Sequence, residues 1–372
     1  MLPIGKIAGG WSLAVLWVAV GAAQHPGVQP PPNPPSALQP PAGPPGDTPP
    51  AAGVRLQGSA AASPPASGTL PRRLDLPGVP NAIQIHQRVI SGGLPQGEAA
   101  FAALARAGIK TILSVDGARP DVESARKYGL RYVHLPHGYD GISEQRLKDL
   151  AKAIQELPGP IYIHCHHGKH RSPAAAAAGC VAAGLVSQSS ALSVLEMAGT
   201  SPNYRGLFQA VKQAKPLDKA QIADHRVAFQ EVAPIPPLAA AMVEIDEIFE
   251  RLKLLAAAGW GRLPGHPDLD AAHEVLLLRE QYRELARQES VAGRPAAFRA
   301  MLAEAEATAG EWESALRQWQ RSSRQQPVPE SVGRLDLRAA EQCRRCHERF
   351  RDVPLSEKPP RTEPPGNSSV KH

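Results

Sequence analysis

The chain has 372 residues, including 39 prolines, and a formal net charge of +6 at pH 7. This length is enough for two ordinary domains and the linkers between them. No block of lysine and arginine is interleaved with aromatic residues, so the composition argues against a nucleic-acid-binding protein, and the modest positive charge suits anionic ligands.

The first 23 residues have the features of an export signal. Lys6 precedes an uncharged run from Ile7 to Ala23, and small residues stand before Gln24. This pattern predicts a signal peptide over residues 1–23 and a periplasmic or secreted protein. The run is also close to the minimum length of a membrane-spanning helix, so an uncleaved anchor that tethers the protein to a membrane is the alternative.

The next two segments differ sharply in composition. Residues 24–80 are rich in proline and poor in large apolar side chains, which predicts an extended, disordered linker. Residues 81–216 instead alternate strand and helix patterns, with strands expected at 83–85, 109–115, 130–135 and 160–164, and helices around 101–104 and over 143–157, 187–198 and 203–215. The alternation predicts an α/β domain with a central, mostly parallel sheet flanked by helices.

The last expected strand of this domain leads into the most informative segment of the chain. Residues His164 to Ser172 read H-C-x-x-G-x-x-R-S and are followed by an alanine-rich helical pattern. The amides of such a loop, together with the N-terminus of the helix, make a binding site for an anion. The same positive field stabilises a thiolate, so Cys165 is a candidate nucleophile.

The other residues of this loop suit a phosphate group. The planar fork of Arg171 can hold two phosphoryl oxygens, and Gly168 lets the loop curl around them. The remaining side chains are cationic or titratable, and the candidate phosphate-binding residues are therefore His166, His167, Gly168, Lys169, His170 and Arg171. A metal site is the alternative use of the histidines, although side chains from one tight loop must splay apart.

The histidine before the cysteine, the glycine three residues after it and the serine after the arginine resemble the signature loop of the protein tyrosine phosphatase superfamily, especially its compact dual-specificity branch. The resemblance implies hydrolysis of phosphate monoesters through a cysteinyl-phosphate, with no cofactor. Cys165 would be the nucleophile, Arg171 would hold the phosphoryl oxygens, and Ser172 would stabilise the thiolate. A rhodanese-like sulfurtransferase also carries its cysteine in an anion-binding loop, but the Arg-Ser ending favours the phosphatase.

Phosphatases of this superfamily also use an aspartic acid that protonates the leaving oxygen and later deprotonates water. Asp140 follows the preceding strand and is our candidate for this catalytic role. Asp116, at the end of an earlier strand, is the rival. The alternative role for Asp140 is to cap the helix that begins near Ser143.

The C-terminal part of the chain has a different pattern. A linker over 217–237 is followed by helical segments at 238–258, 269–290, 295–321 and 335–351, which predicts an all-α four-helix bundle over 238–352. Residues 353–372 are polar and contain several prolines, and we expect a disordered tail.

The last of these helices contains Cys343-Arg344-Arg345-Cys346-His347, the C-x-x-C-H motif that attaches c-type haem. Its place near the end of a four-helix bundle resembles the class II cytochromes c, the cytochrome c-prime group. The resemblance implies a covalent haem c on Cys343 and Cys346, with His347 on the iron, and export of the chain. Met242 is a candidate distal ligand, Met301 its competitor, and an open distal face the alternative. A disulfide or half of a zinc site is the other interpretation of the two cysteines.

The two resemblances together imply an exported phosphatase fused to a haem domain with an electron-transfer, gas-binding or redox-regulatory role. The expected partners are a phosphorylated protein or small-molecule substrate and a redox partner, but no nucleic acid. The alternative function is a non-catalytic phosphate-binding module tethered to a cytochrome that carries electrons or senses a ligand.

Overall fold

The computed structural model describes residues 70–322 and 327–358. The expected signal peptide, most of the expected linker over 24–80 and the end of the expected tail lie outside the described residues. Within the described ranges, no helix is both long enough and apolar enough to cross a membrane.

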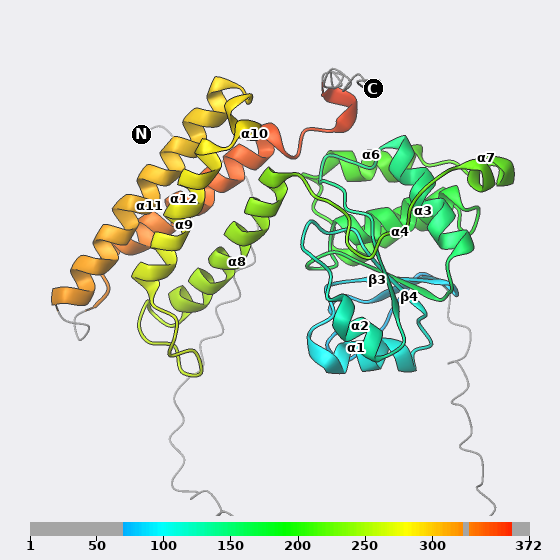
Figure 1. Ribbon diagram of the computed structural model, residues 1–372, viewed down its shortest axis with the longest axis horizontal. Helices are drawn as coiled ribbons and strands as arrows, with labels where there is room; N and C mark the ends of the chain where they lie inside the picture. The colour runs from blue at the N-terminus through cyan, green and yellow to red at the C-terminus, as the bar shows by residue number, and fades with distance from the viewer. Residues whose placement is uncertain (1–69, 323–326, 359–372) are drawn as a thin grey trace, which may run out of the picture. The chain divides into compact units, whose positions relative to one another are not determined.

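The first half of the described chain is a six-stranded sheet with helices on both faces (Figure 1). Its strands are β1 (Arg72–Arg73), β2 (Ile83–His86), β3 (Val89–Gly92), β4 (Thr111–Ser114), β5 (Arg131–His134) and β6 (Ile161–His164). They lie in the order β1-β2-β3-β6-β4-β5. The pairs β3–β6, β6–β4 and β4–β5 are parallel, and β1 and β2 add an antiparallel edge. The predicted α/β class with a mostly parallel sheet is therefore confirmed.

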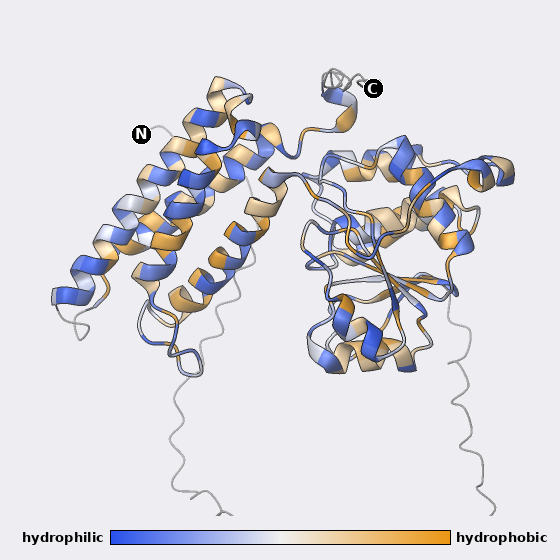
Figure 2. Ribbon diagram, viewed as in Figure 1, coloured by the Kyte–Doolittle hydropathy of each residue, from blue (hydrophilic) through white to orange (hydrophobic). Residues whose placement is uncertain are grey.

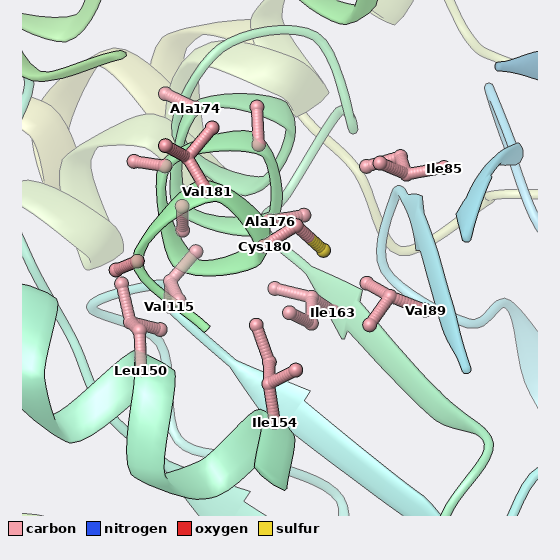
Figure 3. Packing of buried hydrophobic residues seen from close by; sticks show 14 of the residues in the cluster. Ile85, Val89, Val115, Leu150, Ile154, Ile163, Ala174, Ala176, Cys180 and Val181 are labelled. Carbon is pink, nitrogen blue, oxygen red and sulfur yellow. The ribbon is translucent and has the colours of Figure 1, made fainter. Parts of the chain in front are cut away.

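Helices cover this sheet on both sides because its central strands are apolar on both faces. One side packs against α1 (Gly97–Arg106) and α2 (Val122–Lys127), and the other against α3 (Glu144–Glu156), α4 (Arg171–Ala182), α5 (Gln188–Ala198) and α6 (Arg205–Gln213). Figure 3 shows the centre of the second layer, where Ala176 and Cys180 of α4 lie beside Ile163 of β6. A Cβ atom on Gly179 would lie 2.8 Å from Ile154 Cδ1, so the small residues of α4 allow close packing.

The domain extends beyond the expected boundaries at both ends. Arg72 and Arg73 form β1 and pair with β2, so the folded domain begins before residue 81 and the last part of the expected linker is wrong. After residue 216, the short helix α7 (Lys219–Asp224) buries Ile222, and the carbonyl oxygen of Gln230 accepts a hydrogen bond from the N–H of His134. The expected linker over 217–237 is therefore wrong for its first part, because residues 217–230 pack on the sheet layer.

The second half of the described chain is helical, and the predicted all-α class is confirmed. It contains α8 (Pro237–Ala257), α9 (Ala271–Arg287), the short α10 (Glu289–Ala292), α11 (Ala296–Ser322) and α12 (Glu330–Phe350). α9 packs against α8 and α11, and α12 packs against α11. The helices are amphipathic, as Figure 2 shows, and their apolar faces form a cluster around Trp312. The expected disordered tail begins too early, because Leu355–Glu357 forms a 3-10 turn.

Candidate active site

The loop after β6 passes very close to the end of β3. Cys165 follows β6 directly and is 3% exposed, and the loop ends at Arg171, the first residue of α4. Gly168 has a φ of 70°, and a Cβ atom there would lie 2.4 Å from the backbone nitrogen of Gly93. Only glycine combines this conformation with such a close approach, so the sequence can bend the loop tightly here.

Donors from outside the loop hold its carbonyl oxygens. The carbonyl oxygen of residue 166 accepts a hydrogen bond of 2.9 Å from the N–H of Leu94. That of residue 168 accepts one of 2.9 Å from Asn81 Nδ2, and that of residue 169 accepts one of 2.6 Å from the hydroxyl of Thr200. Within the described part of the chain, the backbone N–H groups of residues 166–170 have no such acceptor. These amides are free to bind an anion, as in other backbone nests.

The side chain of Arg171 is anchored but retains a free donor. Its Nη1 lies 3.0 Å from Asp116 Oδ1, and its guanidinium carbon lies 4.6 Å from the ring centroid of Tyr139. The Nε of Arg171 is buried and has no hydrogen-bond partner among the described residues. Leaving such a donor unpaired costs about 1–3 kcal/mol, so an oxygen that accepts from it would be bound favourably.

Asp116 lies just after β4 and is 6% exposed. Its Oδ1 also accepts hydrogen bonds from the N–H groups of Gly117 at 2.6 Å and Ala118 at 3.3 Å. Burial alone would raise the pKa of this carboxyl group, but Arg171 and the two amides outweigh it and hold the pKa below its usual value. An ionised Asp116 is suited to positioning Arg171 and poorly suited to donating a proton.

Asp140 follows β5, in a segment that borders the loop through Tyr139. The ring centroids of Tyr139 and His170 lie 6.3 Å apart. The side chain of Asp140 is largely buried, and its Oδ2 lies 2.6 Å from Lys358 Nζ. Its carbonyl oxygen accepts a hydrogen bond of 2.8 Å from the N–H of Leu355. The ammonium group of Lys358 therefore occupies one of the two carboxylate oxygens of Asp140.

Ser172 connects the cysteine to the end of β3. This serine is fully buried, and its Oγ lies 3.3 Å from Cys165 Sγ and donates to the carbonyl oxygen of Gly92 at 2.8 Å. A hydroxyl group has a single proton, so in this arrangement the thiol of Cys165 is the donor to Ser172. A thiolate at Cys165 would gain a hydrogen bond if the serine proton turned from Gly92 towards the sulfur.

The histidines of the loop have different environments. His164 is buried, with its Nε2 2.5 Å from the hydroxyl of Tyr132, and burial lowers the pKa of His164 to about 4. Burial also lowers the pKa of His170 to about 4, assisted by neighbouring positive charges. His166 and His167 touch edge to face, with ring centroids 4.5 Å apart. Among the described residues, no three His, Cys, Asp or Glu side chains are placed to hold a metal ion together.

The residues of the C-x-x-C-H motif lie on α12. Cys343 and Cys346 are both free thiols, half-buried, and Cys343 Sγ lies 3.8 Å from the hydroxyl of Tyr282. Cys346 packs against the apolar cluster of the helical region, as does Met242 of α8. Met301 is half-buried on α11. Burial, together with Arg351, lowers the pKa of His347 to about 3, so its imidazole is neutral at neutral pH.

Sequence reasoning missed several residues of this site. Asn81 holds the loop at Gly168, and Gly92 accepts from Ser172, but neither belongs to the motif. Pro80-Asn81 is a turn signal, and this was the only local hint that the backbone bends there. Nothing near Lys358 in the sequence indicates its contact with Asp140.

No family model matches this chain, and no curated protein is significantly similar to it. Several solved structures are similar. TpbA of P. aeruginosa in complex with pTyr is 21% identical, with 36% of this chain and 83% of that chain covered and a TM-score of 0.32. The core catalytic domain of the PP-IP phosphatase SIW14 of S. cerevisiae, in complex with citrate, is 16% identical, with 39% and 90% covered and a TM-score of 0.34. PTPMT1 in complex with PI(5)P is 16% identical, with 34% and 89% covered and a TM-score of 0.28.

Proposed function

We propose that the α/β domain is a phosphatase that hydrolyses phosphate monoesters through a cysteinyl-phosphate. The observation that carries the proposal is the set of unused donors around Cys165, namely the amides of residues 166–170 and the Nε of Arg171. A phosphoryl group brings three non-bridging oxygens, which need such donors.

The chemistry would proceed in two steps. The Cys165 thiolate attacks phosphorus, the ester P–O bond breaks, and protonated Asp140 gives its proton to the leaving oxygen. Water then attacks the phosphorus of the cysteinyl-phosphate while Asp140 accepts a proton from it, and the S–P bond breaks to release inorganic phosphate. Ser172 donates a hydrogen bond to the departing thiolate sulfur and keeps its proton, and Asp116 keeps Arg171 aligned. The ion pair between Lys358 and Asp140 must break when Asp140 carries the proton for the first step.

Release of phosphate from an aryl phosphate tests this proposal. Cys165→Ser should abolish turnover, whereas Cys180→Ala, a change at the other cysteine of the domain, should retain most of it. Binding of phosphate without turnover would support the non-catalytic binding module instead. Transfer of sulfur from thiosulfate to cyanide, with a persulfide on Cys165, would support the sulfurtransferase.

We further propose that the helical region binds a covalent haem c. The residues fit this group, because Cys343 and Cys346 lie one turn apart on α12 as free, half-buried thiols beside an apolar cluster. His347 would bind the iron, since its imidazole is neutral, and Met242 at the same cluster is the candidate distal ligand. When bound, the haem would supply one-electron redox chemistry or a site for a small gas.

A covalent haem would also support export, because this attachment takes place outside the cytoplasm in the class II cytochromes c. Residues 1–23 would then act as a signal peptide or as a membrane tether. A c-type absorption spectrum that survives acidic acetone extraction, and that disappears in Cys343→Ala, is the expected result. A protein without haem, in which thiol titration shows Cys343 and Cys346 joined as a disulfide, would contradict the haem assignment.

A further inference from the structure

A cavity of about 480 Å³ lies beside the catalytic loop. Its walls come from β1, the turn before β2, the segment before α1 and the loop itself. The residues that line it are Arg73, Leu74, Pro80, Asn81, Ala82, Leu94, Gln96, His166, His167 and Lys169. No carboxylate is among these lining residues.

Two of the lining cations, Arg73 and Lys169, take part in no ion pair among the residues that the structure describes. Arg73 donates from Nη1 to Asn81 Oδ1 at 2.7 Å and from Nη2 to the carbonyl oxygen of Met197, so its guanidinium is fixed by neutral acceptors. Within residues 70–322 and 327–358, no carboxylate forms an ion pair with Arg73 or Lys169. A wall with two uncompensated positive charges attracts anions.

Asn81 connects this wall to the catalytic loop. Its φ is 52°, a left-handed conformation that asparagine tolerates better than most residues. Its Nδ2 donates to the carbonyl oxygens of Gly168 at 2.9 Å and Ala198 at 3.0 Å, while its Oδ1 accepts from Arg73. One side chain therefore fixes both the loop that would bind the scissile phosphate and the cation beside it.

We propose that this cavity is a second anion subsite, which binds a further phosphate of a small-molecule substrate that carries two phosphate groups. The inference rests on the phosphatase function proposed above. Arg73 offers a planar fork for phosphate oxygens and Lys169 a point charge. Leu74, Pro80 and Leu94 offer apolar contacts for the carbon skeleton between the phosphates, and the volume lies within the range of small-molecule sites.

The test measures kcat/KM for phosphate release from two series of substrates. One series is alkanediol bisphosphates of increasing chain length, and the other is alkyl monophosphates of the same lengths. The wild type should prefer the best bisphosphate about tenfold or more, the effect of one charge-assisted contact. Arg73→Gln should remove most of that preference by raising KM for the bisphosphate, with little change for the monophosphate. Arg72→Gln is the matched control, because Arg72 neighbours Arg73 on β1, its side chain binds Gln84 of the adjacent strand β2, and it does not line the cavity.

Three outcomes would overturn the subsite. The first is an equal loss of kcat/KM on the bisphosphate and the monophosphate in Arg73→Gln. The second is an unchanged preference for the bisphosphate in that variant. The third is a doubly phosphorylated peptide that the wild type prefers to every alkanediol bisphosphate. If the wild type hydrolyses neither substrate, the phosphatase proposal fails, and calorimetry on Cys165→Ser with butanediol bisphosphate then decides the subsite. Weaker binding after the additional change Arg73→Gln supports it, and unchanged binding refutes it.

Discussion

Replacing Asp116 by asparagine should separate the anchoring of Arg171 from the chemistry of the site. The two side chains meet at 3.0 Å, and only 8% of the Asp116 side chain and 11% of the Arg171 side chain are exposed. Removing one partner of a buried ion pair costs about 3–5 kcal/mol, because the other charge remains buried without compensation. We expect a value near the lower end, about 3 kcal/mol, since an amide oxygen can still accept the hydrogen bond.

Urea unfolding of the full chain can measure the stability of the α/β domain and of the helical region separately. The tryptophans among the described residues, Trp260, Trp312 and Trp319, all lie in the helical region, so their fluorescence follows that region. Circular dichroism follows both. Asp116→Asn should lower the urea midpoint of the transition seen by circular dichroism but not by fluorescence. Asp75→Asn, which removes an exposed carboxylate from the same domain, should change stability by less than about 0.5 kcal/mol.

Repeating the urea unfolding in the presence of inorganic phosphate tests the role of Asp116 more specifically. An anion in the loop would compensate the charge of Arg171 that Asp116→Asn leaves unpaired, so phosphate should raise the urea midpoint of the variant more than that of the wild type. Equal stabilisation of both proteins, or a variant as stable as the wild type without phosphate, would refute the view that Asp116 serves mainly to compensate Arg171.

Three further predictions concern the neighbours of the nucleophile. Ser172→Ala should slow the second step about 100-fold, because the variant lacks one hydrogen-bond donor to the developing charge on sulfur. We expect a burst of released alcohol followed by slow release of phosphate. A linear time course without a burst would contradict this role of Ser172. Lys358→Gln should raise kcat/KM about twofold to fivefold, because it removes the ion pair with Asp140. The control Lys148→Gln, which breaks an ion pair on α3, should leave kcat/KM unchanged. An unchanged or lower kcat/KM in Lys358→Gln would contradict the view that Lys358 hinders Asp140. Because burial lowers the pKa of His164 to about 4, the unfolded chain binds a proton there between pH 6.5 and 4 and the folded chain does not. Stability should therefore fall as the pH is lowered through this window, and a urea midpoint that stays constant would argue against a buried neutral imidazole.

The part of the site that depends on adjacent residues could be predicted from the sequence. The apolar run Ile161–His164 must be a buried strand, and the alanine-rich run after Ser172 must be a helix, so the loop between them had to present its amides at a strand end. The four helical segments of the C-terminal half were visible for the same reason, because their apolar spacing is periodic.

The contacts between distant segments could not be predicted in this way. Asp116 and Asp140 both follow strands that end at the same edge of the sheet, and only the folded structure shows that one meets Arg171 and the other Lys358. β3 escaped notice because Val89–Gly92 is short and ends in glycine, which reads as a turn. Its place beside β6 nevertheless supplies Gly92, the acceptor for Ser172.

The most direct test of the account is mass spectrometry of the protein after an acid quench during turnover of an aryl phosphate. We predict one added phosphoryl group on the peptide that contains Cys165, present in Ser172→Ala at a higher level than in the wild type and absent from Cys165→Ser. Turnover that persists in Cys165→Ser, or a phosphoryl group found on another residue, would contradict the central claim.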